Sequence, residues 1–181
     1  GVPSHHIGGP ITHKKIASVH EATGFMVGDG KGGLRPVSAD QLLEAAREVA
    51  SKRMAKGSNM SSPSEVRECL PALLGTYAHE RFGVLFLDTQ HRLIVYEEMF
   101  RGTLSSTVVH PREIVKAALK HDAAAVILAH NHPSGMLEPS QADIQITNRI
   151  KEALALVDIQ VIDHFIATGT TTVSMAEKGL L

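Results

Sequence analysis

The sequence has little cysteine, few aromatic residues and no surplus of charge of either sign. Among its 181 residues there is one cysteine (Cys69) and no tryptophan, and the formal net charge is −1. A single cysteine excludes an internal disulfide and a cysteine-based zinc site. Dedicated nucleic-acid binders usually carry a strong basic excess, and this sequence as a whole has none.

Long apolar runs are also missing. No run approaches the roughly 20 apolar residues that a membrane-spanning helix needs, and residues 1–6 contain no signal-peptide core. We therefore expect a cytoplasmic protein that does not bind membranes. The fractions of hydrophobic (43%) and charged (20%) residues are close to the globular average, so the chain is expected to bury a core.

The sequence pattern divides the chain into three parts. Residues 1–23 are rich in glycine, proline and histidine without periodicity, and we expect a disordered tail. Residues 24–61 are expected to form a small extension with a strand, a glycine-rich turn and a helix. Ser38 and Gln41 have the spacing of a capping box, which predicts that this helix begins after Ser38. Residues 62–181 are expected to form the main domain.

Within the main domain, the apolar period changes repeatedly between helical and strand spacing. Helices are predicted over 62–78 with a kink at Pro71, from Pro111 onward, and over 140–156. Strands are predicted over 82–87, 93–100, 123–129, 159–167 and 171–175, and residues 102–109 could continue the sheet. Hairpins and helices alternate irregularly, so the predicted fold class is mixed α+β or α/β rather than a doubly wound parallel sheet.

Eleven histidines stand out in the composition, and two of them directly follow a predicted buried strand. His130 and His132 are two residues apart, so on an extended backbone both imidazoles point to the same side. Seven residues separate His132 from Ser140, and Asp143 follows three positions later. Two imidazoles and one carboxylate are a typical catalytic zinc set, in which the metal lowers the pKa of its bound water to about 7. The pattern predicts one Zn²⁺ held by His130, His132 and Asp143.

The same residues also have simpler interpretations. Ser140 and Asp143 also have the spacing of a helix capping box, and taken alone this is the better explanation of them. His-x-His alone is a weak pattern. The two interpretations are compatible, because a carboxylate in the first helical turn can lean back toward the strand end that carries both histidines. The conjunction of all four residues favours the metal site.

These residues resemble the JAMM (MPN-type) metalloprotease motif. The match consists of His130-x-His132, Pro133-Ser134-Gly135, Ser140 and Asp143, and the additional Pro139 and Asp163-His164 resemble RadC-type proteins of that family. The resemblance covers about residues 62–181. The resemblance implies an MPN-type mixed sheet flanked by helices, similar to the fold of cytidine deaminases. The best-studied members of the family cleave the isopeptide bonds of ubiquitin-like tags.

The family motif also contains a glutamate where the first helix meets the first strand, and Glu80 lies there. Its rivals, Glu97 and Glu98, lie inside a predicted strand. The resemblance thus implies that Glu80 is the general base, which moves a proton from zinc-bound water to the leaving group. It implies that Ser140 donates a hydrogen bond to the oxyanion. His164 is either a group that supports a metal ligand or a satisfied core histidine.

The resemblance implies a zinc-dependent metallopeptidase or isopeptidase with an unknown protein or peptide substrate. Two alternatives stay open. One is a nucleic-acid-processing or DNA-repair role, which the RadC label suggests and the near-neutral charge argues against. The other is a non-catalytic, partner-binding MPN module. We find no helix-hairpin-helix pattern, so the sequence resembles the shorter RadC-like proteins of mobile elements, for which intrinsic DNA binding is not expected.

Overall fold

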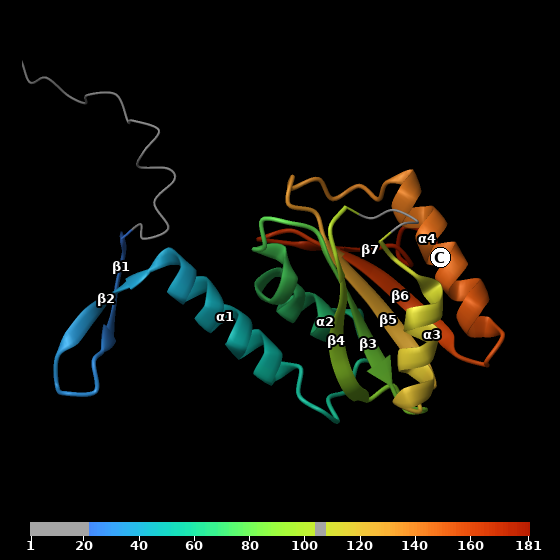
Figure 1. Ribbon diagram of the computed structural model, residues 1–181, viewed down its shortest axis with the longest axis horizontal. Helices are drawn as coiled ribbons and strands as arrows, with labels where there is room; N and C mark the ends of the chain where they lie inside the picture. The colour runs from blue at the N-terminus through green and yellow to red at the C-terminus, as the bar shows by residue number, and fades with distance from the viewer. Residues whose placement is uncertain (1–21, 104–107) are drawn as a thin grey trace, which may run out of the picture. The chain divides into compact units, whose positions relative to one another are not determined.

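The computed structural model describes residues 22–103 and 108–181 (Figure 1). The chain divides into two compact units, residues 1–45 and 46–181. Most of the predicted tail, residues 1–21, lies outside the described residues. Its last two residues do not belong to a tail, because strand β1 begins at Ala22.

The described part of the first unit is a β-hairpin followed by the start of a helix. Strands β1 (Ala22–Gly28) and β2 (Leu34–Ser38) pair antiparallel. In the turn between them, the Asp29 carboxylate accepts hydrogen bonds from the backbone N–H groups of Lys31 and Gly33, at 2.7 and 2.9 Å. This confirms that the glycine-rich segment is a hairpin turn.

Helix α1 (Ala39–Arg53) begins with the predicted capping box. Ser38 Oγ accepts from the Gln41 N–H at 3.2 Å, and Gln41 Oε1 accepts from the Ser38 N–H at 3.1 Å. Residues 46–53 of α1 belong to the second unit, where Ala50 and Met54, the residue after the helix, are part of a buried apolar cluster.

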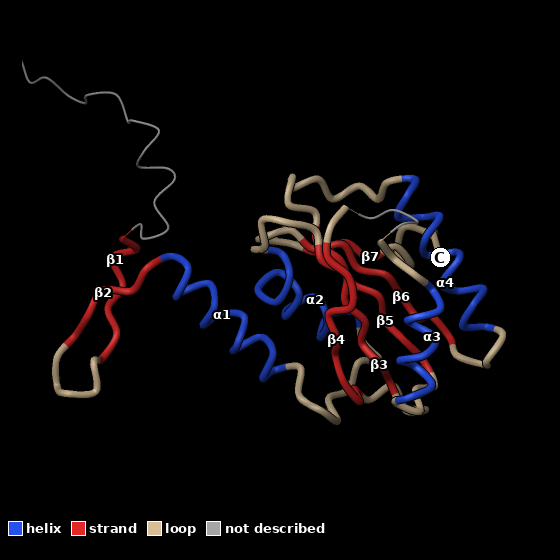
Figure 2. Tube along the Cα trace, viewed as in Figure 1, coloured by secondary structure: helices blue, strands red, loops and turns tan. Residues whose placement is uncertain are grey.

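The second unit is built on a five-stranded sheet with the strand order β4-β3-β5-β6-β7 (Figure 2). Its strands are β3 (Arg81–Leu87), β4 (Leu93–Arg101), β5 (Ala125–Asn131), β6 (Gln160–Ala167) and β7 (Thr172–Ser174). All neighbours pair antiparallel except β5 and β6, which are parallel and are joined through helix α4. The predicted mixed α/β class is confirmed.

Helices cover both faces of this sheet. They are α2 (Pro63–Leu70), the π-helix η1 (Pro71–Gly75), α3 (Pro111–Lys120) and α4 (Gln141–Ala155). Figure 1 shows α3 and α4 together on one face, opposite α2. Strand alternation supplies both cores: Leu85 and Leu87 of β3 belong to the cluster with α2, while Val84 and Phe86 belong to the cluster with α3 and α4. Within the described residues, no helix combines the length and apolarity needed to cross a bilayer.

Two predictions for the main domain need correction. The helix predicted over 62–78 ends at Gly75 and is α-helical only to Leu70, because Pro71 has no N–H to continue the regular hydrogen bonds. The extension of the sheet over 102–109 is wrong for 102–103 and 108–109, which are not in strands, while 104–107 lie outside the described residues. Gly102 has a φ of 109°, which takes the chain out of the extended conformation.

Candidate metal centre

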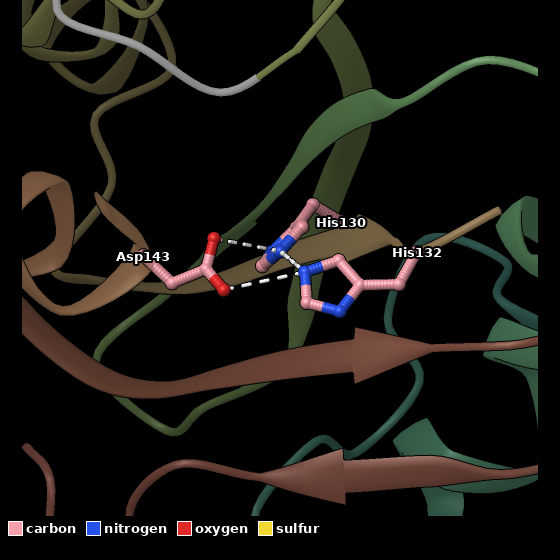
Figure 3. Close-up of side chains that lie close together, drawn as sticks. All are labelled: His130, His132 and Asp143. Atoms are coloured by element: carbon pink, nitrogen blue, oxygen red, sulfur yellow. Dashed lines mark hydrogen bonds and ion pairs between the residues drawn. The ribbon is translucent and has the colours of Figure 1, made fainter. Parts of the chain in front are cut away.

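Two elements bring the three predicted metal ligands together. His130 lies at the end of β5, the central strand, in which every residue is buried, and His132 directly follows that strand. Asp143 comes from the first turn of α4 (Figure 3). His130 and Asp143 are fully buried, whereas the His132 side chain is 11% exposed. The group therefore lies at the carboxyl end of a rigid strand and is open to solvent on the His132 side.

The three side chains present their polar atoms to one point. His130 Nε2 lies 2.9 Å from His132 Nε2 and 3.1 Å from Asp143 Oδ1, and His132 Nε2 lies 3.2 Å from Asp143 Oδ2 (Figure 3). The ligand atoms all lie within 4.8 Å of one another, so this group can hold a metal ion.

The hydrogen bond of His132 on its other nitrogen indicates that a cation fits here. His132 Nδ1 lies 2.7 Å from the carbonyl oxygen of Met136. A carbonyl can only accept, so Nδ1 carries the hydrogen, and when the ring is neutral its Nε2 lone pair faces the Asp143 carboxylate. Two acceptors 3.2 Å apart repel each other unless a positive charge lies between them.

The protonation states of Asp143 and His130 suit a metal ligand set. Burial would raise the pKa of Asp143, but contacts with His130 and His132 outweigh it and hold the pKa well below its usual range. Burial lowers the pKa of His130, so this ring is neutral at neutral pH. Contact with Asp143 raises the pKa of His132, because the carboxylate favours a positive charge at this point. An ionised carboxylate and a neutral imidazole are the forms that bind metals.

Asp143 also completes the helix cap that was the alternative explanation of its spacing. Ser140 Oγ accepts from the Asp143 N–H at 3.1 Å, and Asp143 Oδ2 accepts from the Ser140 N–H at 2.7 Å. A carboxylate has about four lone-pair sites, so the cap leaves others directed at the histidines. The cap is therefore confirmed, and it leaves the carboxylate able to act as a metal ligand as well.

A pocket of about 290 Å³ opens beside these ligands. Its lining includes the two predicted catalytic residues, Glu80 and Ser140, next to His132 and Asp143. The other lining residues are Thr103, Ser134, Met136, Glu138 and Ala142. A substrate in this pocket would thus meet the ligand group, a carboxylate and a hydroxyl at the same time.

The glutamate candidates lie in different environments. Glu80 directly precedes β3, and its carbonyl oxygen accepts a hydrogen bond from Gly102 N at 2.8 Å. Its charge is close enough to act on both His130 and His132.

The two rivals of Glu80 are engaged elsewhere on β4. Glu97 Oε1 lies 2.7 Å from His121 Nε2, and Glu98 Oε1 accepts from Arg81 and Arg101 at 2.8 and 3.0 Å. In the described part of the chain, neither glutamate lines the pocket beside the ligand group.

Sequence reasoning missed Asn131, the residue between the two histidines. Asn131 is fully buried, and its Oδ1 accepts from the Arg81 N–H at 2.6 Å. Its Nδ2 donates to the carbonyl oxygens of Tyr77 and His79 at 3.3 and 3.1 Å. The amide thus holds the backbone on both sides of Glu80. Strand alternation in the sequence could have indicated this role, because it points the Asn131 side chain to the opposite side from His130 and His132. A buried amide on that side must find hydrogen-bond partners.

His164 lies behind the ligand group on β6. It is fully buried, and its Nε2 lies 2.7 Å from His130 Nδ1 while its Nδ1 lies 2.6 Å from Thr147 Oγ1. Burial lowers the pKa of His164 well below its ordinary value, so the ring is neutral. The structure therefore places this residue in direct contact with a candidate ligand.

Comparison with known proteins gives one family. The model of the RadC-like JAB domain matches residues 60–180. Similar curated proteins include several with the name "UPF0758 protein". That of Cellvibrio japonicus is 54% identical over 157 residues, and that of Marinobacter nauticus is 48% identical over the same length, each match covering 87% of this chain and 70% of the relative. That of Nitrosomonas eutropha is 46% identical over 173 residues, or 96% of this chain and 76% of the relative. The chain belongs to the RadC-like JAB domain family, within the JAMM-type hydrolase superfamily.

Proposed function

We propose that this protein is a zinc-dependent peptidase or isopeptidase, in which Glu80 is the general base and Ser140 donates to the oxyanion. The observation that carries the proposal is the pocket in which these two side chains line the same space as His132 and Asp143. A hydrolase needs a proton acceptor and an oxyanion donor within reach of one reacting carbonyl, and this pocket supplies both beside a metal site.

The ligand geometry supports zinc as the metal. Two ligand atoms of a tetrahedral zinc site with bond lengths of about 2.0–2.1 Å are about 3.3 Å apart. The three separations in the His130, His132 and Asp143 group are 2.9, 3.1 and 3.2 Å. Two histidines with one carboxylate, and no cysteine, are a common catalytic zinc set that leaves a fourth position for water. The chemistry that zinc supplies when bound is acidification of water and polarisation of a carbonyl.

The roles of the two catalytic residues follow from their positions. The half-buried Glu80 accepts the proton of the attacking water and passes it to the leaving nitrogen. Ser140 Oγ uses a lone pair to accept from the Asp143 N–H, so its own O–H is left to donate to the substrate oxygen as negative charge develops. The helix cap fixes the serine in this orientation.

The charge of the pocket favours a peptide over a nucleic acid. The lining contains three carboxylates, those of Glu80, Glu138 and Asp143, and no lysine or arginine among the described residues. A phosphodiester brings negative charge into the site and is usually held by arginine or lysine. A peptide or an isopeptide is neutral at the bond that is cut. We therefore propose an unidentified protein or peptide substrate.

The test begins with the zinc-loaded chain and three substrate sets: a peptide library, lysine-linked isopeptides and single-stranded DNA. We expect hydrolysis of an amide bond. The Glu80→Gln variant should keep one zinc per chain by elemental analysis, because Glu80 is not a ligand. Its kcat should fall about 10²–10⁴-fold, the usual contribution of general acid–base catalysis.

The matched control is Glu97→Gln, which removes a carboxylate that contacts His121 rather than the pocket and should leave kcat unchanged. Cleavage of DNA with no cleavage of amides would favour the nucleic-acid-processing alternative. Zinc binding without hydrolysis of any of the three substrate sets would favour the non-catalytic module. Full activity of Glu80→Gln would assign the base to another residue.

A further inference from the structure

A chain of buried hydrogen bonds leads from His130 to the backbone of helix α4. His130 Nδ1 faces His164 Nε2 at 2.7 Å, His164 Nδ1 faces Thr147 Oγ1 at 2.6 Å, and Thr147 Oγ1 lies 2.6 Å from the carbonyl oxygen of Asp143. The three side chains in this series of hydrogen bonds, those of His130, His164 and Thr147, are all fully buried. Its two ends are the two elements that carry the candidate ligands.

Full burial keeps both imidazoles neutral, and with neutral rings only one assignment of hydrogens satisfies every contact in this series. The Asp143 carbonyl can only accept, so the single hydroxyl hydrogen of Thr147 points to it. Thr147 Oγ1 must then accept from His164 Nδ1–H. A neutral His164 has no second ring hydrogen, so its Nε2 accepts from His130 Nδ1–H. His130 is left with a lone pair on Nε2, the atom that faces His132 and Asp143.

The opposite assignment has a definite consequence. If His130 carried its hydrogen on Nε2, that hydrogen would lie toward Asp143 Oδ1, 3.1 Å away, and would occupy the position of the metal. His164 would then donate through Nε2, and its Nδ1 would need a hydrogen from Thr147. Because Thr147 gives its only hydrogen to the Asp143 carbonyl, this state leaves two acceptors 2.6 Å apart.

We propose that Thr147 and His164 are positioning residues that keep His130 in the tautomer that binds the metal through Nε2. The inference rests on the metal site of the proposed function and does not depend on hydrolytic activity. Partners of this kind typically account for about 10–100-fold in metal affinity. In this protein the donor-to-acceptor direction of the hydrogen-bond series is set by the Thr147 hydroxyl, which donates to the carbonyl oxygen of Asp143 four residues earlier in α4.

The first test reads the tautomer in the metal-free wild-type chain. Long-range ¹H–¹⁵N spectra distinguish a ring with its hydrogen on Nδ1 from a ring with its hydrogen on Nε2. We expect the Nδ1–H form at neutral pH for both His130 and His164. The Nε2–H form at either ring would overturn the inference. Because no zinc is present, this result is independent of whether the proposed function holds.

The second test measures zinc affinity by competition with a chromophoric chelator. Thr147→Val removes the hydroxyl at nearly constant volume and should weaken zinc binding about 10–100-fold, whereas Thr147→Ser should stay close to wild type. The control is Thr168→Val, which removes another buried threonine hydroxyl that bonds to Thr171.

Thr168→Val is expected to lower stability, because it loses the bonds to Thr171, but it should keep the zinc affinity. Equal affinity in the Thr147→Val and wild-type chains, or an equal loss in Thr168→Val, would overturn the inference. A wild-type chain that binds no zinc would count against the proposed function instead, and the tautomer spectra would still decide the inference.

Discussion

Asn131 shows that a residue can shape a site that its side chain does not enter. At the end of β5, His130 and the following His132 point to one side of the chain and Asn131 to the other. The Asn131 amide bonds to the backbone of residues 77, 79 and 81, so the loop that carries Glu80 is tied to the strand end that positions two candidate ligands. The distance between the proposed base and the ligands therefore depends on one side chain.

Asn131→Ala should loosen this loop without removing the metal. It leaves the Arg81 N–H without its partner, and an unsatisfied buried donor costs about 1–3 kcal/mol of unfolding free energy. Hydrogen exchange at the Arg81 amide should become faster, while zinc stays at one per chain by elemental analysis. The same substitution at the exposed Asn148 should change the unfolding free energy by less than about 0.5 kcal/mol. Unchanged exchange at Arg81 would show that other contacts hold the loop.

The residues that could be predicted are those whose position depends on local spacing. His130, His132 and Asp143 follow from strand alternation and from one helix turn, and both can be recognised in the sequence. The partners of Asn131 and Thr147 depend on the β3–β5 register and on the packing of α4 against β6. The contact between Asn131 and Arg81 joins positions 50 residues apart, which no local pattern encodes.

At the scale of the elements, Gly75 determines where η1 ends. It ends η1 where the backbone meets the turn after β6, and a Cβ atom at this position would lie 1.9 Å from the carbonyl oxygen of Thr168. Pro71 indicated a kink from the sequence, but the sequence did not show where the helix ends, because the close approach at Gly75 joins positions that are far apart in the chain. The predicted extension of the sheet over 102–109 was wrong for a similar reason, since amino-acid composition does not reveal the positive φ of Gly102.

Gly75→Ala should destabilise the second unit strongly. The added methyl group meets backbone atoms, which cannot rotate away, so we expect a loss of about 3 kcal/mol in urea denaturation. Gly28→Ala is the matched control, because a Cβ atom there meets nothing within 4 Å. If both variants unfolded at the wild-type urea concentration, η1 would not pack against the turn as described.

At the scale of the whole molecule, metal binding and folding should be linked. The ligands come from β5 and α4, which are brought together only in the folded chain, so zinc binds the native state in preference to the unfolded one. At a free zinc concentration of 100 times Kd, the stabilisation is about 2.7 kcal/mol. For a chain of this size that corresponds to a rise in Tm of roughly 5–10 °C.

Calorimetry with zinc and with a chelator checks this rise. The His132→Ala variant removes one ligand and should lose most of the zinc-dependent shift while keeping its metal-free Tm near that of the wild type. A shift of the same size in this variant would mean that zinc binds elsewhere, for example at other histidines of the chain.

The capping box at the start of α4 has a kinetic consequence. Asp143 holds the first helical turn and faces the metal position with the same carboxylate, so fraying of that turn and departure of the ion become one event. Loss of an N-cap costs about 1 kcal/mol, and Ser140→Ala should therefore speed zinc release roughly fivefold in a chelator-chase experiment. An unchanged release rate would separate the two events. The residence time of the ion is then set by the end of a helix, even though the other two ligands lie at the end of a buried strand and directly after it.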